Sequence, residues 1–516
     1  MSGTPLFRAL TTAVLLFAAL LAPRSAPAQP IPLTPDPIAV PTGLDDAGFL
    51  AWLQERVDEI GDVRKVRTSD LPRVFRELDS GEVAAEAWLG DHGESPVRAE
   101  VLRILARLLF LNQDRVVALA DHQNQVEWGA QLQPIEIEAI LTAHRNRTLG
   151  VIQEGLDLAP ETGPLRAALL ETYGEVMLRA QRHIEAAEAL TLSIQADPTR
   201  PELDETYIKL GETFILAGDY PRGEAVALEG IVRFPRSKLW PHYFWYYHKV
   251  LRHQGKLEQA LSAWAQLLPR IRAGAAGEAM VAAGAFVVPE EYRIDYERYA
   301  ARARFYEGFF LYSLGEPERA LEAIRAFADH HRERQMDGET LPMDLVTYLD
   351  FQADPYDRRI SLLQGRPLPD LEGKVDWVQP PTDAAREKPA RVRIFASASR
   401  ALGRQQGMFE LLRSLGQEYG EKLHIDWISF ALRRGDIADQ EVAAMRGAIE
   451  AHGIEDWSVA IDVEDLDVHR EHGLEAANVT LYLTDAEGRL HWLLIDPMSW
   501  DEGLIRRVLQ RALGGE

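Results

Sequence analysis

Few residues of this chain have the type and spacing that catalysis or metal binding needs. His469 and His472 lie three apart in the segment HREHG, a spacing at which two imidazoles can share one helix face. No third ligand accompanies them in the sequence, so we interpret both as solvated histidines near a helix end. The acidic run from Asp462 to Asp467 lacks the Gly and the terminal Glu of a calcium loop, and we interpret it as a polar turn before a helix.

Cysteine chemistry is excluded, because the 516 residues include no Cys. This removes disulfides, thiolate metal sites and every mechanism with a Cys nucleophile. The sequence also contains no G-x-S-x-G, H-E-x-x-H, G-x-G-x-x-G or Walker motif. We therefore expect neither an enzyme nor a protein that holds a metal or another cofactor.

Side chains suited to binding are concentrated in one place. The densest aromatic stretch is WPHYFWYYHK, from Trp240 to Lys249. Helical periodicity places Phe244 and Tyr247 on the packing face, which leaves other aromatic and basic side chains on a different face. Aromatic and basic side chains on one surface are typical of protein-binding sites.

Charge and length limit the class of partner. Asp and Glu number 80 against 56 Lys and Arg, which gives a formal net charge of -24. Because a nucleic-acid binder needs a basic footprint for the phosphates, we exclude nucleic acid as a partner. The length suggests two to four domains of ordinary globular composition.

The N-terminal segment is typical of an export signal. An apolar run from Ala9 to Ala22 is followed by Ala26-Pro27-Ala28, which offers small residues for cleavage. We expect residues 1–28 to be a signal peptide and the mature chain to begin at Gln29, outside the cytoplasm, in a bacterial periplasm or secreted. An uncleaved N-terminal anchor is the alternative. No later stretch is apolar enough for membrane insertion, and residues 29–44 form a Pro-rich linker.

Residues 45–350 carry amphipathic helical patterns that come in pairs. Corresponding points recur, the first three at a spacing of 37 residues: Tyr173-Gly174, Leu210-Gly211, Tyr247-His248 and Glu307-Gly308. A small residue follows in each unit, at Ala186, Gly223, Ala260 and Ala320. Glycines between the paired helices, Gly218, Gly255 and Gly315, would end the first helix of a pair. Small residues at fixed points allow two helices to approach closely.

This pattern resembles the tetratricopeptide repeat (TPR), a helix-turn-helix unit of about 34 residues. The segments that carry the resemblance are LLETYGEVMLRAQRHIEAAEALTLSIQADP, YIKLGETFILAGDYPRGEAVALEGIVRFP and ARFYEGFFLYSLGEPERALEAI. The resemblance implies an all-α solenoid whose groove binds a protein or peptide partner. A non-repetitive helical bundle is the alternative.

The family's ligand-facing positions can be carried over to this chain. They fall on His242, Trp245, Lys249 and Arg252 in the third unit and on Arg302, Phe305, Phe309 and Tyr312 in the fourth. Mixed aromatic and basic side chains on a concave face suit an extended, acidic peptide. The alternative is that they pack against the inserted segment Ala273–Glu291. That segment is either a connector, which we favour, or an extra helix in the groove.

A second type of pattern begins near the C-terminal quarter of the chain. Residues 351–390 are rich in proline and form a predicted linker and lead-in, after which the periodicity changes. From Arg391 the expected order is strand, helix, strand, helix, strand, strand, helix, with a hairpin around the turn from Asp485 to Gly488. This order predicts an α/β domain at residues 391–516.

The segments LLQGRPLPDLEG, IFASAS and YLTDAEGRLHW resemble extracytoplasmic thiol-disulfide oxidoreductases of the TlpA type, which implies a thioredoxin-like fold. The family's two redox cysteines fall on Ser399 and Leu402, and its cis-proline falls on Val479. A Ser hydroxyl does not ionise near neutral pH and a Leu side chain has no leaving group. The resemblance therefore implies a redox-inert domain.

Three functions are compatible with this sequence. The one we favour is an exported, non-enzymatic scaffold whose TPR-like groove binds a protein or peptide, with the thioredoxin-like domain as a second interaction surface. A thiol-disulfide oxidoreductase of the cell envelope is disfavoured by the absence of Cys. A structural component of an envelope assembly differs from the scaffold in predicting stoichiometric co-purification with that assembly.

Overall fold

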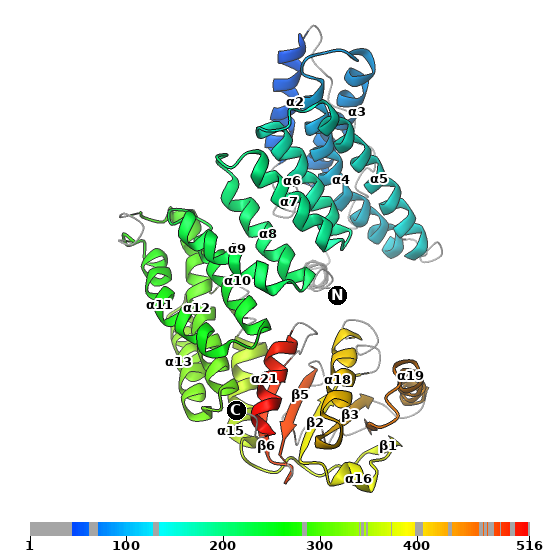
Figure 1. Cartoon of the computed structure of the whole chain (residues 1–516), viewed down its shortest axis with the longest axis vertical. Helices are drawn as coiled ribbons and strands as arrows, with labels where there is room; N and C mark the ends of the chain where they lie inside the picture. The colour runs from blue at the N-terminus through cyan, green and yellow to red at the C-terminus, as the bar shows by residue number, and fades with distance from the viewer. Residues whose placement is uncertain are drawn as a thin grey trace. The chain divides into compact units, whose positions relative to one another are not determined.

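The computed structural model describes most of the chain (Figure 1). The described residues are 44–60, 71–126, 134–280, 286–339, 341, 345–346, 349–372, 374–397, 406–431, 436–463, 468, 472, 479–485, 487–495 and 501–513. The predicted signal peptide, nearly all of the Pro-rich linker, Ser399, Leu402 and His469 lie outside them. Within these ranges no helix is long and apolar enough to cross a lipid bilayer. The chain divides into two compact units between Ala217 and Gly218.

The first unit is helical throughout its described part. Its helices are α2 (Asp46–Ile60), α3 (Leu71–Asp91), α4 (Arg98–Val126), α5 (Pro134–Leu158), α6 (Pro164–Arg179), α7 (His183–Ala196) and α8 (Leu203–Ala217). Apolar side chains of α2 to α4 form its main core, in which Leu53, Val74 and Leu108 are fully buried. The helical pattern predicted for residues 45–350 is confirmed in the described part of this unit.

The second unit begins with more helices and ends with a sheet. Its helices before the sheet are α9 (Tyr220–Arg233), α10 (Trp240–His253), α11 (Leu257–Ala275), α12 (Glu290–Ser313), α13 (Pro317–Met336), the π-helix η4 (Leu349–Ala353) and α15 (Asp354–Leu363). In the described part of the insertion, Met280 and Phe286 form an isolated β-bridge and Val288 is buried, as expected of a connector. The chain is thus mostly helical and repeat-like, with a mixed sheet at its C-terminal end.

The predicted small residues do bring paired helices together. A Cβ on Gly174 of α6 would lie 2.8 Å from Leu190 Cγ of α7, and a Cβ on Gly308 of α12 would lie 2.9 Å from the Ala320 carbonyl oxygen of α13. In the third helix pair, α10 and α11, His248 stands at the equivalent position. Its ring lies 4.9 Å from the ring of Trp264 and 4.9 Å from that of Phe310. The third helix pair therefore packs around an imidazole instead of a glycine.

The expected glycine turns are also present. Gly218, Gly255 and Gly315 have φ of 75°, 69° and 75°, the left-handed conformation that ends a helix. After two of these glycines the next N–H bonds back to the carbonyl five residues earlier, as Lys256 N donates to Leu251 O at 2.9 Å. The first repeat makes the same bond, from Arg182 N to Met177 O at 2.9 Å, but its left-handed residue is Gln181, with φ 61°.

The C-terminal sheet has six strands in the order β1-β4-β3-β2-β5-β6. They are β1 (Asp376–Gln379), β2 (Ala390–Phe395), β3 (Leu423–Ala431), β4 (Ser458–Val463), β5 (Thr480–Thr484) and β6 (Leu490–Ile495). The three strands β2, β3 and β4 are parallel, whereas β5 runs antiparallel to β2 and β6 antiparallel to β5. The predicted hairpin is confirmed, with Gly488 at φ 73° in its turn.

Two strands were not expected from the sequence. β1 lies in the segment predicted as linker, and β4 contains Asp462, which we had interpreted as part of a polar turn. Asp462 is 1% exposed, because β4 is an inner strand between β1 and β3. The interpretation of Asp462 is therefore wrong. Ser458 to Asp462 are all buried, so this strand lacks the alternation of apolar and polar residues by which a half-buried strand is recognised.

The helices of the α/β part are α16 (Asp383–Arg386), α18 (Gln406–Tyr419), the 3-10 turn η5 (Gly420–Lys422), α19 (Asp436–His452) and α21 (Glu502–Ala512). One hydrophobic core runs from the repeat helices to the sheet, including Trp240 of α10, Phe310 of α12, Trp427 of β3 and Leu504 of α21. The predicted linker, residues 351–390, lies inside this second unit and holds α15, β1 and α16. Its role as a boundary between two folding domains stays a prediction.

Replacing Gln181 by Gly is expected to stabilise the first unit by about 1 kcal/mol, because a side chain in the left-handed region is strained and glycine is not. The free energy of unfolding in urea measures this effect. Gln181→Ala keeps a Cβ and is the matched control, which we expect to leave stability within about 0.5 kcal/mol of the wild type. A glycine variant no more stable than the alanine variant would contradict the strain.

Candidate functional site

The side chains of α10 form two stripes along the helix, a buried packing stripe and a half-buried second stripe. Trp240 and Phe244 are fully buried and Tyr247 is 8% exposed, so the predicted packing face is confirmed for Phe244 and Tyr247. The second stripe holds four of the predicted ligand-facing residues, all half-buried: His242, Trp245, Lys249 and Arg252. Pro241 in the first turn of α10 supports the helix start without losing a hydrogen bond.

Side chains of α12 meet this stripe from the facing helix. The hydroxyl group of Tyr299 lies 3.0 Å from His242 Nδ1. The Arg302 guanidinium lies 5.6 Å from the centre of the Trp245 ring, within the range of a cation–π contact. The Trp245 ring is also 5.2 Å from that of Tyr306. The structure thus brings Arg302 together with Trp245, and Tyr299 together with His242. The role of these residues in binding a partner stays a prediction.

The other three predicted residues of α12 are covered by the chain itself. Phe305 and Phe309 are each 2% exposed and Tyr312 is 1% exposed. Tyr356 of α15 packs on both Phe rings, at centroid distances of 5.7 Å and 5.8 Å. The Tyr312 hydroxyl donates to Gln364 Oε1, just after α15, at 2.8 Å. This end of the α10–α12 surface is therefore filled by α15.

Arg252 has an acidic partner from the C-terminal helix. Asp501 stands at the N-cap of α21 but makes no capping hydrogen bond there, and its Oδ1 lies 2.6 Å from Arg252 Nη2. The Asp501 side chain is 1% exposed and that of Arg252 16%. Burial alone would lower the pKa of Arg252, but the Asp501 carboxylate outweighs this and raises it. Both groups are charged in a buried setting.

Tyr356 joins the repeat helices to the sheet. On one side its ring packs on the aromatic residues of α12, and on the other its hydroxyl oxygen accepts the Ile495 N–H of β6 at 3.1 Å. Burial raises the pKa of Tyr356 well above its ordinary value, so the phenol stays protonated. A second link runs from Trp492 Nε1 of β6 to Ser313 Oγ of α12, at 3.1 Å.

A close backbone contact fixes α21 against the end of α10. A Cβ on Gly503 would lie 1.9 Å from the His253 carbonyl oxygen, so no other residue fits there without movement. Gly255 faces the same contact, and a Cβ on it would lie 2.6 Å from the Gly503 carbonyl oxygen. Arg507 of α21 adds an exposed ion pair to Glu258 of α11, at 3.2 Å.

The predicted redox positions are placed only in part. Ser399 and Leu402 lie outside the described residues, and Val479 is 2% exposed directly before β5. The described residues contain no cis peptide bond. The interpretation of His472 as solvated is wrong, since this side chain is fully buried.

His472 is buried because its polar atoms are satisfied inside the protein. Arg393 Nη1 of β2 donates to His472 Nε2 at 2.9 Å, and His472 Nδ1 lies 2.7 Å from the Val468 carbonyl oxygen. Since Arg393 can only donate, Nε2 accepts and the proton sits on Nδ1, which makes this imidazole neutral. Asp426 of β3 lies 3.6 Å from Arg393 Nε, and hydrogen bonding to His424 together with the charge of Arg393 lowers its pKa despite burial.

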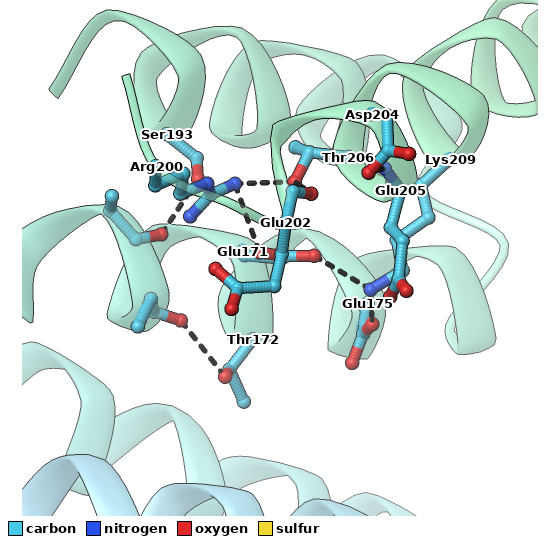
Figure 2. A network of polar contacts seen from close by, with 12 residues as sticks. Glu171, Thr172, Glu175, Ser193, Arg200, Glu202, Asp204, Glu205, Thr206 and Lys209 are labelled. Atoms are coloured by element: carbon cyan, nitrogen blue, oxygen red, sulfur yellow. Dashed lines mark hydrogen bonds and ion pairs between the residues drawn. The ribbon is translucent and has the colours of Figure 1, made fainter. Parts of the chain in front are cut away.

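A charged network joins helices of the first unit (Figure 2). Lys209 of α8 reaches between Glu171 and Glu175 of α6, and its Nζ lies 2.6 Å from Glu171 Oε1. Arg200 Nη2 lies 2.9 Å from Glu171 Oε2, and Arg107 of α4 donates to Glu175. Burial alone would raise the pKa of Glu175, but the Lys209 and Arg107 charges lower it from 4.5 to about 2.

Ion pairing and burial hold several titratable groups of these arrangements in one protonation state near neutral pH. The carboxylates of the first-unit network are paired with cations, and burial keeps the Tyr312 and Tyr356 phenols protonated. Burial lowers the pKa of His248 well below its ordinary value, which keeps that imidazole neutral. Across the described part of the chain, no group of three or more His, Asp or Glu is placed to hold a metal ion.

Comparisons with known proteins identify no family for this chain. No protein-family model matches the chain, and no curated protein matches it. A solved structure, the crystal structure of a tetratricopeptide repeat protein from Parabacteroides merdae ATCC 43184, is similar at 14% sequence identity with a TM-score of 0.23; the match covers 54% of this chain and 92% of that one. Because that likeness is weak, the repeat architecture rests on the helix contacts of this chain.

The acidic network predicts a loss of stability at low pH. Glu175 contributes fully above its unfolded pKa of 4.5, and the contribution disappears as the pH falls towards about 2. Between about pH 6 and about pH 3 the wild type should lose about 2 kcal/mol more than Glu175→Gln. Urea unfolding at both pH values measures the difference. The control variant Glu188→Gln, on the exposed face of α7, should keep the pH dependence of the wild type. Equal losses of stability in the wild type and in Glu175→Gln would refute the role of Glu175.

The buried Arg252–Asp501 pair predicts strong coupling between α10 and α21. Asp501→Asn or Arg252→Met should each weaken the docking of α21 by about 3 kcal/mol, because each leaves a buried charge unpaired. The double variant should lose clearly less than the sum of the two. Hydrogen exchange at the α21 amides measures the docking. Glu258→Gln removes the exposed pair to Arg507 and should cost less than about 1 kcal/mol; additive losses in the double variant would rule out the coupling.

Proposed function

We propose that the protein is an exported, non-enzymatic scaffold whose TPR-like groove binds a protein or peptide partner. The observation that carries the proposal is the meeting of α10 and α12, which places Arg302 over Trp245 and Tyr299 against His242. Half-buried aromatic and basic side chains side by side are the residues that dominate protein-binding sites. Export rests on the signal-like segment of the sequence, and it places the scaffold in a bacterial periplasm or outside the cell.

Several recurring contacts support a TPR-like reading of the helices. Gly174 and Gly308 make equivalent close contacts in two helix pairs. Tyr243 of α10 packs on Gly230 of α9, and Tyr296 of α12 packs on Gly274 of α11, each with a ring atom 2.3 Å from where a Cβ would lie. Contacts that repeat both within pairs and between pairs are what a solenoid of similar units requires.

Strand order supports a thioredoxin-like assignment for the C-terminal domain. The unit β2-α18-β3 has two parallel strands, and the hairpin β5-β6 followed by α21 adds two antiparallel strands beside β2. The sheet segment β3-β2-β5-β6 has the arrangement that the resemblance implies, with β4 and β1 added at one edge. We propose that this domain is redox-inert, since a chain without Cys has no thiolate to attack a disulfide.

A structural component of an envelope assembly is the second candidate. The observation that favours it is the firm docking of the sheet on α10 and α12 through Tyr356, Trp492 and Gly503. A sheet domain docked firmly on the repeat helices would suit a component of a larger assembly as well as a scaffold. In affinity capture, a scaffold should retain one partner that depends on the groove, whereas an assembly component should retain a whole complex.

Affinity capture tests the function. The tagged mature chain, starting at Gln29, should retain a specific protein from its native envelope fraction. Trp245→Ala combined with Arg302→Gln should lose it, because both side chains form the α10–α12 surface. Arg319→Gln changes an exposed residue of α13 that pairs with Glu316, and this control variant should still retain the partner. Retention by the double variant would exclude the groove, and reduction of insulin by the wild type would exclude the redox-inert scaffold.

A further inference from the structure

A histidine lies inside the apolar packing of the third helix pair. His248 of α10 is 1% exposed, and four aromatic rings from α10, α11 and α12 surround it at centroid distances of 4.7 to 5.2 Å. We call these four rings the aromatic box: Trp245, Trp264, Tyr306 and Phe310. The other three units carry glycine at the equivalent point: Gly174, Gly211 and Gly308. The third unit therefore buries a titratable group where the other three have none.

Within the described residues, neither ring nitrogen of His248 has a hydrogen-bond partner. Trp264 Nε1 of the aromatic box, which can only donate, has none there either. A neutral imidazole carries one N–H, whereas a protonated imidazole carries two and a positive charge. Protonation inside the box would thus bury a charge and add a donor where the existing donors already find no acceptor, so the closed packing strongly disfavours it.

The basic residues that follow His248 on its own helix oppose protonation further. They are Lys249, Arg252 and His253, and each adds to the effect of burial. Burial is the largest cause that lowers the pKa of His248 well below its ordinary value of 6.5. The Trp245 carbonyl group favours the charged form, but its effect is the smaller one. The imidazole is therefore held neutral by its whole surroundings.

The other elements around the ring do not compensate a positive charge. Tyr306 is the titratable group of α12 in the box, and Arg302 of the same helix lies in cation–π range of the box. Asp501 of α21 supplies a carboxylate on this side, but that carboxylate pairs with Arg252 at 2.6 Å. Among these groups a protonated His248 would meet aromatic rings and no carboxylate of its own. Cation–π contacts would offset only part of the cost of burying the charge.

We infer that His248 makes the packing of α10 against α11 and α12 an acid-sensitive switch, which is closed while the imidazole is neutral and opens when the imidazole takes up a proton. In an open form, in which α10 parts from the rings of α11 and α12, the imidazole meets water and can be protonated. Protons therefore bind the open form more tightly than the closed form, and acid shifts the equilibrium towards the open form. This inference goes beyond the proposed function, since it concerns the fold itself and needs no partner.

The size of the effect follows from the two protonation equilibria. Because the pKa of His248 is lowered in the closed form, its stabilisation is complete above the ordinary pKa of 6.5 and is lost as the pH falls below that value. Between about pH 7 and about pH 5 the open form gains a proton and the closed form does not. The equilibrium constant for opening should therefore rise about twentyfold over this range.

Hydrogen exchange on the full mature chain tests the switch at the amides of α10, α11 and α12. After correction for the intrinsic exchange rates, the wild type should show the rise of about twentyfold between about pH 7 and about pH 5. His248→Phe fills the box with a ring that does not titrate, and His248→Gln places a neutral amide there. Both variants should change by less than about threefold. His491→Gln changes an exposed histidine of β6 in the same unit, and this matched control should keep the rise of the wild type.

Three results would overturn the switch. An equal rise in the wild type and in both His248 variants would show that other groups cause the acid response. A wild type without any rise would show that opening does not expose His248. A rise confined to the amides of α13 would assign the response to His331, which is 3% exposed and whose pKa burial lowers to about 4. If His248→Phe were too large for the box and failed to fold, His248→Gln would decide the same question.

Discussion

The second unit depends on one buried ion pair. A charge that leaves water costs several kcal/mol unless an opposite charge stands close to it, so neither Arg252 nor Asp501 can be buried alone. Because one partner lies on a repeat helix and the other at the start of α21, the sheet domain and the repeats stabilise each other. Tyr356 follows the same logic, since its hydroxyl oxygen satisfies the Ile495 N–H of the sheet. The close backbone contact at Gly503 adds a steric fit between α21 and the end of α10. The docked body is held by complementary polar groups as well as by its shared apolar core.

Much of the fold could be predicted from local sequence patterns. Gly218, Gly255 and Gly315 ended helices where expected, because a left-handed residue after a helix is a local requirement that glycine meets. The hairpin from β5 to β6 was equally accessible, since its turn chemistry is local. β1 and β4 were missed because a short strand flanked by prolines or acids has no clear period, and its burial is decided by the strands beside it.

The candidate site shows where such patterns reach their limit. Trp245 and Arg302, two residues named from the repeat register, lie in contact, since repeat spacing sets which faces of successive first helices meet. Their role in binding stays a prediction. The register gave no sign that α15 would cover Phe305 and Phe309, or that Asp501 would reach Arg252, since these contacts join segments far apart in the chain. The one local sign was Gly503, a glycine in the first turn of a helix, where it has no role in ending that helix. His472 was misjudged for the same reason: its hydrogen-bond partner Arg393 lies on a distant strand.

The separation of Arg252 from Asp501 along the chain has a kinetic consequence. The two residues are 249 positions apart in the sequence, so their contact closes a very long loop. Loop closure of this kind is slow compared with the pairing of neighbouring helices, and the repeats will assemble before the sheet domain seals them. Asp501 therefore reaches Arg252 only in the step that closes this loop, and the burial of Arg252 belongs to that late step of folding.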